Sequence, residues 1–171
     1  MIMTHRGFTP EIESSAFVAE NASVIGDVKV GPLSSIWFGA VIRGDESPIR
    51  IGKGTSVQDN CVLHCDRQSP MNIGDNCTLG HGCIVHGATI GSNVLIGMGA
   101  VVLNGAAVGD NCIIAAGAVV KENAVIPPNS LAAGVPAAVK RTLSEEEIAD
   151  MQKTSYYVKL SREYIEEENE R

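Results

Sequence analysis

The sequence lacks the features that would place the chain in a membrane or on an export route. It has no run of about 20 consecutive apolar residues, the length that is needed to cross a bilayer. The opening residues, MIMTHRGFTPEIESS, have no apolar core like that of a secretion signal. We therefore expect a soluble, cytoplasmic protein with no membrane partner.

Basic clusters and paired cysteines are also scarce. The 171 residues include 13 Lys and Arg against 20 Asp and Glu, and no basic cluster is dense enough to follow a phosphate backbone. Nucleic acid is therefore not expected as a partner. The 5 cysteines leave one over after any full pairing, which fits a reducing compartment. No CxxC pair occurs, so the sequence gives little support for a cysteine zinc site.

What the sequence does contain is an internal repeat with a period of six. The repeated aliphatic positions are Ile12, Val18, Val24, Val30, Ile36, Ile42, Ile51, Val57, Leu63, Ile73, Leu79, Val85, Ile90, Ile96, Val102, Val108, Ile114, Val120 and Ile126. Two irregular connections, 44–50 and 65–72, are expected to be loops at corners. A period of six fits neither a helix nor a simple strand alternation, but it is typical of a parallel β-helix.

The hexapeptide pattern resembles that of the left-handed β-helix family, in which three hexapeptides form one triangular coil. This resemblance implies an all-β fold, a parallel left-handed β-helix of about six coils with a C-terminal α-helix. We predict an N-terminal segment over 1–11, the β-helix over 12–128, a connector over 129–142 and the helix over 143–171.

The C-terminal helix carries a start signal and a packing face. Ser144 followed by Glu147 forms a capping box. Six residues, most of them apolar and spaced three and four apart, predict the face of this helix that packs on the β-helix. That face comprises Ile148, Met151, Ser155, Val158, Arg162 and Ile165.

Counting hexapeptides assigns the histidines to faces of the β-helix. His64 and His86 follow inward residues of one face in successive coils, so they become outward neighbours about 4.8 Å apart. His81 falls near a corner of a different face, directly above Asp59. His81 and His86 therefore cannot chelate the same ion within one chain.

This placement predicts a metal site that is shared between chains. A catalytic zinc ion usually has three protein ligands and one water molecule. His64 and His86 supply two ligands, and His81 of a neighbouring chain can supply the third if the prisms pack around a threefold axis. We therefore predict a homotrimer with one metal site at each interface.

Three motifs resemble those of the γ-class carbonic anhydrases and their relatives: RGDE at 43–46, VQDNCVLH at 57–64 and GHGCIVH at 80–86. The resemblance implies that His64, His81 and His86 bind Zn²⁺, with Fe²⁺ or Co²⁺ as alternatives, in a homotrimer. It also implies a zinc-dependent lyase, in which a metal-bound hydroxide hydrates CO₂ reversibly to bicarbonate.

The same resemblance assigns roles to residues around the metal. Arg43 and Asp45 are expected to pair across the subunit interface and organise the site. Gln58 is expected to orient the metal-bound water or bicarbonate. Asp59 is expected to hold His81 from outside the metal shell.

Proton transfer is where this sequence departs from the family pattern. Active relatives carry a longer acidic loop after the first histidine, with a glutamate that serves as proton shuttle. Here that loop is only CDRQSPM at 65–71, with no glutamate. Glu46 matches a second family glutamate and is expected to accept the proton in part, so CO₂ hydration is expected to be weak.

Other assignments stay open at the level of sequence. Relatives place a polar helix residue over the site, and spacing does not choose among Tyr156, Tyr157 and Tyr164. Cys65, beside His64, is expected to be a free, inert thiol. An acyl-CoA-dependent acyltransferase is the main alternative, because GVPA at 134–137 resembles the connector of hexapeptide acyltransferases. A non-catalytic, metal-binding trimeric scaffold is the third interpretation.

Overall fold

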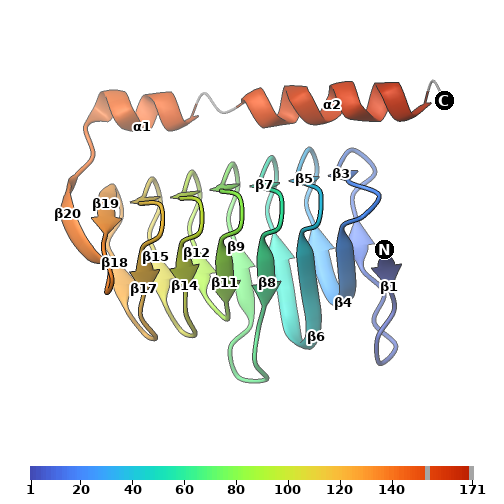
Figure 1. Cartoon of the computed structure of the whole chain (residues 1–171), viewed down its shortest axis with the longest axis horizontal. Coiled ribbons are helices and arrows are strands. Elements are labelled where there is room, and N and C mark those ends of the chain that lie inside the picture. Colours follow the sequence, from blue (N-terminus) through green and yellow to red (C-terminus); the bar gives the residue numbers. More distant parts are fainter. Residues whose placement is uncertain (153–154, 170–171) are drawn as a thin grey trace.

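Three walls of short parallel strands form the body of the protein (Figure 1). The computed structural model describes residues 1–152 and 155–169. Their strands stack into a parallel β-solenoid of about seven turns, consistent with the left-handed β-helix expected from the repeat. The strands β1 and β19 lie outside the hexapeptide series, which accounts for a count above the six coils predicted.

Each wall is a column of strands that pair from one coil to the next. The first wall contains β3 (Phe17–Val18), β5 (Ser35–Ile36), β7 (Ser56–Val57), β10 (Thr78–Leu79), β13 (Leu95–Ile96), β16 (Ile113–Ile114), β19 (Ser130–Ala133) and the antiparallel β20 (Ala138–Thr142). The second contains β1 (Ile2–Met3), the first halves of β4 (Ser23–Val30) and β6 (Val41–Ile51), β8 (Val62–His64), β11 (Ile84–His86), β14 (Val101–Val102) and β17 (Val119–Val120). The third contains β2 (Glu11–Ile12), the second halves of β4 and β6, β9 (Met71–Ile73), β12 (Thr89–Ile90), β15 (Ala107–Val108) and β18 (Val125–Ile126).

Two long strands turn a corner without a break. β4 and β6 pair with each other along both the second and the third wall, with a register shift between Gly26 and Val28. The prediction that 44–50 is a loop is therefore wrong, because these residues lie inside β6. Gly44, Ile49 and Arg50 pair with β4, and the register shift falls across the residues between them. The other irregular connection is a loop, which leaves β8 at His64 and enters β9 at Met71.

The repeat register matches the observed strand pairing. Val57 pairs with Leu79 on the first wall, and Leu63 pairs with Val85 on the second. These aliphatic side chains point into the prism and are buried. Burial of about 25 cal/mol for each Å² of apolar surface makes this stacked core the main source of stability.

Gly74→Ala is expected to destabilise the solenoid more than Gly117→Ala. A Cβ at Gly74 would lie 2.7 Å from backbone atoms of Gly91 and Ser92 in the next coil. Backbone cannot move aside as a side chain can, so the cost should reach the upper end of the roughly 1–3 kcal/mol of overpacking. Gly117 has a φ of +67° and open space around it, so only about 1 kcal/mol of backbone strain is expected. Thermal unfolding of both variants measures the difference, and equal midpoints would contradict it.

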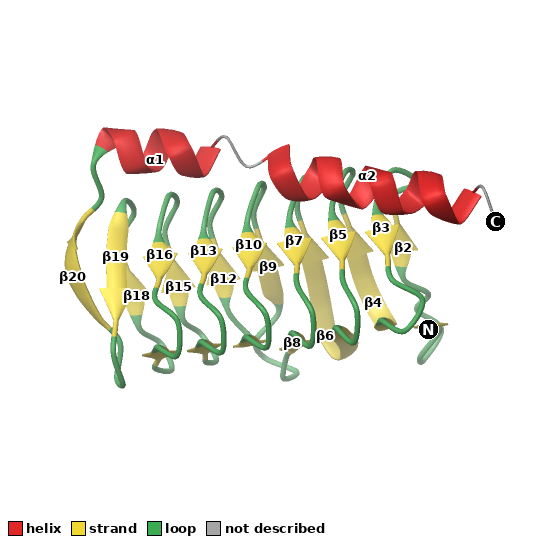
Figure 2. Ribbon diagram, turned by 45° about the horizontal axis from the view of Figure 1, so that its top comes forward, coloured by secondary structure: helices red, strands yellow, loops and turns green. Residues whose placement is uncertain are grey.

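The predicted C-terminal helical segment consists of α1 (Glu145–Gln152) and α2 (Ser155–Asn169), which run along the solenoid (Figure 2). The capping box is confirmed, since the Ser144 backbone N–H donates to Glu147 and the Glu147 N–H donates to the Ser144 hydroxyl. On α2, Tyr164 packs against Phe17 and Trp37, with ring centroids 5.6 and 5.4 Å away. These aromatic contacts fix α2 over the N-terminal turns.

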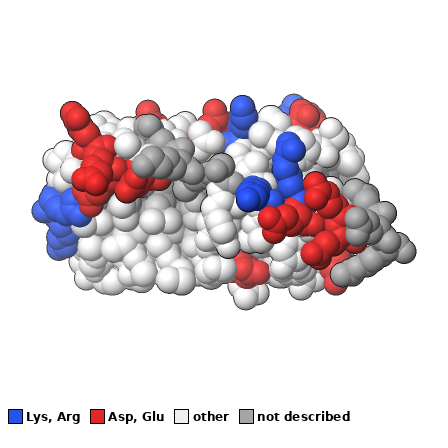
Figure 3. Space-filling view, turned by 90° about the horizontal axis from the view of Figure 1, so that it is seen from above, with Lys and Arg blue, Asp and Glu red and all other residues white. Residues whose placement is uncertain are grey.

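The helices also carry much of the charge on their side of the molecule (Figure 3). The first turn of α1 contains Glu145, Glu146 and Glu147, where negative charge favours a helix N-terminus. Among the described residues, no helix has both the length and the apolar character needed to cross a membrane.

Candidate metal centre

His64 and His86 stand side by side on the second wall. Their backbones are partners in β8 and β11, which confirms the placement predicted from the repeat. The ring centroids are 5.0 Å apart, and Nδ1 of His64 lies 2.9 Å from Nε2 of His86. The two side chains are only 16 % and 28 % exposed, so both rings are largely shielded from water.

Each of these rings is held from outside by an oxygen atom. Nε2 of His64 lies 3.1 Å from a carboxylate oxygen of Asp45, and Nδ1 of His86 lies 2.6 Å from the side-chain oxygen of Asn104. A carboxylate and an amide oxygen only accept, so each outer ring nitrogen carries the proton. In their neutral forms, the two rings therefore turn lone pairs toward each other, an arrangement that a cation between them stabilises.

Asp45 is in turn held by Arg43. The guanidinium lies 2.5 Å from a carboxylate oxygen of Asp45. Partial burial raises the pKa of Asp45, but the hydrogen bonds from Arg43 and His64 outweigh it, so the pKa lies below its usual range. Asp45 thus stays ionised as the acceptor for His64. The observed pairing of Arg43 with Asp45 lies within one chain, where the resemblance implied a pairing across the interface.

His81 lies on the turn between the first and second walls, beside Asp59. Nδ1 of His81 is 2.7 Å from a carboxylate oxygen of Asp59, as the repeat register predicted. The carboxylate fixes the proton on Nδ1 and leaves Nε2 with a lone pair. The His81 side chain is 52 % exposed, so this nitrogen is open to a group from outside the chain.

Gln58 lies under the same turn. Its side-chain oxygen accepts a hydrogen bond of 3.2 Å from the backbone N–H of His81. Its Nε2 is buried and has no hydrogen-bond partner in the described part of the chain. A buried donor without a partner is costly, so this amide is suited to bind an acceptor that enters the site.

Tyr157 and Tyr164 of α2 both reach this region. Tyr157 lines two cavities of about 200 and 450 Å³, and both are also lined by Gln58 and His81. Tyr164 lines only the smaller one and packs in the aromatic cluster. Tyr156 is 65 % exposed. The sequence could not distinguish these three, because helix placement depends on contacts with the first wall.

Residues of the short loop after β8 lie beside the histidine pair. Glu46 forms an ion pair of 3.4 Å with Arg67 of this loop. Cys65 donates a hydrogen bond to the Ser47 carbonyl, and burial raises the pKa of its thiol to about 11. A thiol with so high a pKa is protonated at neutral pH, which fits the expected inert cysteine.

Two residues of this region were missed at the sequence level. Asn104 contacts His86, and its Nδ2 donates a hydrogen bond of 2.6 Å to Asp66 of the short loop. Counting hexapeptides places Leu103 next to His64 and His86 on the outward side of the second wall. Asn104 is the residue after Leu103, so the count missed it by one position.

The structure thus forms two groups of predicted site residues. Arg43, Asp45, His64 and His86 lie together on the second wall, while Gln58, Asp59 and His81 lie together at the corner. Within the residues that the structure describes, no group of three or more His, Cys, Asp or Glu side chains is placed to hold a metal ion in one chain.

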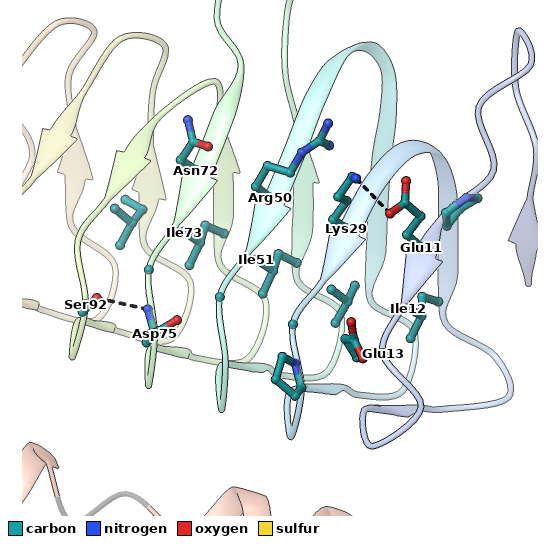
Figure 4. A pocket seen from close by; sticks show the side chains of 17 residues that line it. Glu11, Ile12, Glu13, Lys29, Arg50, Ile51, Asn72, Ile73, Asp75 and Ser92 are labelled. Carbon is teal, nitrogen blue, oxygen red and sulfur yellow. Dashed lines mark hydrogen bonds and ion pairs between the residues drawn. The ribbon is translucent and has the colours of Figure 1, made fainter.

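A wider groove of about 850 Å³ runs along the third wall (Figure 4). Both of its basic side chains are paired, and Lys29 forms an ion pair of 2.8 Å with Glu11. Arg50 is likewise paired with Asp27 at 2.7 Å. None of the three histidines lines this groove, so its size does not mark the site of chemistry.

Comparison with known proteins agrees with this fold. The family described as "Bacterial transferase hexapeptide (six repeats)" matches residues 70–104 and 87–122. The solved structure of a hexapeptide transferase family protein from Anaplasma phagocytophilum has a TM-score of 0.92 and 40 % identity, over 95 % of this chain and 97 % of that one. The protein is therefore a hexapeptide-repeat β-solenoid.

Two curated relatives narrow the class. A carbonic anhydrase of Geobacillus kaustophilus is 47 % identical over 97 % of this chain and 88 % of its own length. Gamma carbonic anhydrase 1 of Arabidopsis thaliana is 42 % identical over 92 % of this chain and 60 % of its own length. The chain belongs to the γ-class carbonic anhydrase family of hexapeptide-repeat proteins.

Proposed function

We propose that the protein is a metal-dependent lyase that hydrates CO₂ reversibly to bicarbonate, at sites shared between the subunits of a homotrimer. The observation that carries this proposal is the 2.9 Å approach of Nδ1 of His64 to Nε2 of His86, with both outer nitrogens held by oxygen acceptors. Ligating histidines in metal sites are typically held in this way.

The histidine pair fits a divalent cation in chemistry and nearly in distance. Two nitrogens bound tetrahedrally to zinc at ~2.0–2.1 Å lie about 3.3 Å apart, so the observed pair needs to open by only a few tenths of an ångström. Zn²⁺, Fe²⁺ and Co²⁺ all accept imidazole ligands. His81 of a neighbouring chain would complete the set of three.

The second wall offers the surface for such a neighbour. Outward apolar residues form one continuous row beside the histidine pair, in register from strand to strand. The row comprises Val41, Val62, Ile84, Val101 and Val119. Val62 and Ile84 are 39 % and 40 % exposed in the single chain. An apolar row of this length supports burial against another chain, and a closed ring of three chains gives three equivalent sites.

Each residue of the site then has its own role in the reaction. A bound divalent ion supplies Lewis-acid activation of water, which makes a nucleophile available near neutral pH. Asp45 and Asn104 hold His64 and His86, and Asp59 holds His81. The free Nε2 of Gln58 donates to an oxygen of CO₂ or bicarbonate. Tyr157 closes the cavity on the side of α2.

Proton release is the step for which this chain is least equipped. Glu46 is the acidic residue that could accept the proton, but its carboxylate is already paired with Arg67. The loop 65–71 carries no glutamate. We therefore infer slow CO₂ hydration. We also infer a cytoplasmic location, which the 5 free, buried cysteines support.

Metal content and CO₂ hydration test the proposal together. Protein purified without oxygen should contain about one divalent ion for each chain, because each trimer has three interfaces. Stopped-flow hydration should be slow in dilute buffer and rise several-fold with added imidazole, which replaces the missing proton acceptor. His64→Ala is the control and should lose both properties. A metal-free wild type would contradict the site, and fast hydration in dilute buffer would contradict the argument from the loop.

An acyltransferase remains the second candidate, because the Anaplasma relative is named a transferase and shares the whole fold. That function needs acyl-CoA along the prism and no three-histidine site. Binding of CoA by the metal-free protein would favour it. A trimeric scaffold that keeps the metal for stability alone is the third candidate, and it predicts that metal removal lowers the thermal midpoint although no CO₂ is hydrated.

A further inference from the structure

We propose that Asp66 and Asn104 are positioning residues that set the proton of His86, so that its Nε2 stays available as a metal ligand. The part of this proposal that concerns the metal rests on the proposed function, whereas the position of the His86 proton can be tested in metal-free protein. It gives the short loop after β8 a role other than proton transfer.

The direction of the hydrogen bonds follows from Asp66. An ionised carboxylate has no proton to donate, so the group of Asn104 that lies 2.6 Å from Asp66 must be its NH₂. The side-chain oxygen of Asn104 then faces Nδ1 of His86, at 2.6 Å. An oxygen acceptor requires a proton on Nδ1. The lone pair is therefore left on Nε2, which faces His64.

The packing keeps these three side chains in contact. Gly87, which follows His86, leaves the space that Asn104 and the loop use: a Cβ there would lie 2.3 Å from the Asn104 oxygen and 2.7 Å from Cβ of Ser69. The backbone of Gly87 is hydrogen-bonded to the coil before it and to the coil after it, since its N–H donates to the His64 carbonyl and its carbonyl accepts from the Gly105 N–H. Asn104 and the loop are thus placed by backbone contacts of the second wall.

Asp66 acts on His86 through Asn104 and not directly. Its nearest recorded approach to Nε2 of His86 is 4.0 Å, which is too long for a hydrogen bond. Replacing Asp66 by asparagine would supply a donor as well as an acceptor at position 66, so the Asn104 amide would no longer be held in one orientation. In the flipped orientation its NH₂ faces Nδ1 of His86, which moves the ring proton to Nε2 and removes the ligand.

A set of four variants tests this order of action. Asp66→Asn removes the group that can only accept, Asn104→Leu removes the relay itself, and the double variant Asp66→Asn with Asn104→Asp exchanges the carboxylate and the amide. In the double variant the carboxylate at 104 accepts from Nδ1 of His86, and the amide at 66 donates to it. Asp110→Asn is the matched control, because Asp110 also accepts a hydrogen bond, from the Ser92 N–H, in a turn that contains no histidine.

Two readouts are needed. The ¹⁵N shifts of the His86 ring in metal-free protein at pH 9, well above the usual imidazole pKa of about 6.5, report which nitrogen carries the proton. Chelator competition with Zn²⁺ or Co²⁺ gives the dissociation constant. Asp66→Asn and Asn104→Leu should reduce the Nδ1–H form and weaken metal binding about 10–100-fold. The double variant should restore both, and Asp110→Asn should change neither.

The inference would be overturned if the His86 ring shifts of Asp66→Asn and Asn104→Leu equal those of the wild type. It would also be overturned if the shifts of the double variant are no closer to the wild-type values than the shifts of Asp66→Asn are. A wild-type protein that binds no metal, but whose ring proton follows the expected order, would support the positioning role. In that case the proposed function would be what fails.

Discussion

An equal mixture of His64→Ala and His81→Ala protomers is expected to recover about a quarter of the wild-type metal sites, although each variant alone recovers none. Each site takes His64 and His86 from one chain and His81 from the next. A site is intact when the first chain is the His81 variant and the second is the His64 variant. With random assembly each condition holds for half of the chains, which gives about one quarter.

The matched control is a mixture of His64→Ala with His86→Ala. His64 and His86 lie 2.9 Å apart in one chain, so every chain in this mixture lacks one of the pair. No order of assembly rebuilds a site, and recovery should stay at the background of the single variants. Both mixtures are refolded together from denaturant and the bound metal is measured per chain. Equal recovery in the two mixtures, or no recovery in either, would contradict a site shared between chains.

The separation of the histidines into two groups is the part of the site that the sequence predicts well. Leu63 and Val85 are 22 residues apart, which is one coil of 18 residues and four more from the loop after β8, and this count is enough to bring His64 beside His86. The same count places His81 above Asp59 on another face. Both results depend on spacing within a regular wall, which is a local property of the chain.

The partners of the histidines are harder to predict, because they come from irregular segments. Asp66 lies in a loop whose path is set by its contacts, and its hydrogen bond with Asn104 spans 38 residues. No period connects these two positions. The short loop 65–71 suggested only what it lacks, a glutamate for proton transfer, and not what its Asp66 contacts.

Helix packing shows the same limit. Spacing on the C-terminal segment predicts a face that includes Arg162, but Arg162 is exposed. The residues of α2 that pack on the solenoid include Ile165, as predicted, but also Tyr157, Leu160 and Tyr164, which were not predicted. An aromatic cluster on the N-terminal turns selects this face, and the pattern of the helix alone does not contain that information. The predicted position Ser155 has a side chain outside the described residues.

Metal removal is expected to lower the thermal midpoint of the wild-type protein by about 5–10 °C. A ligand that binds only the folded state at 100 times its dissociation constant contributes ~2.7 kcal/mol. For a chain of this length, 1 kcal/mol corresponds to roughly 2–4 °C. The apolar row on the second wall does not depend on the metal, so the chelated protein should remain a trimer at micromolar concentration. Calorimetry with and without chelator, alongside sedimentation, measures both properties.

His64→Ala provides the control for this experiment. It removes a ligand without touching the apolar row, so its midpoint should lie near that of the chelated wild type and should not respond to the chelator. If the chelator lowers the thermal midpoints of both proteins equally, it acts elsewhere. If it leaves the midpoint of the wild type unchanged, that result would contradict a metal bound between subunits. Restoring the metal separates the remaining functions. If the midpoint and slow, imidazole-dependent CO₂ hydration both return, the ion serves catalysis, whereas return of the midpoint alone identifies the scaffold, in which the metal bound by the same histidines only stabilises the trimer.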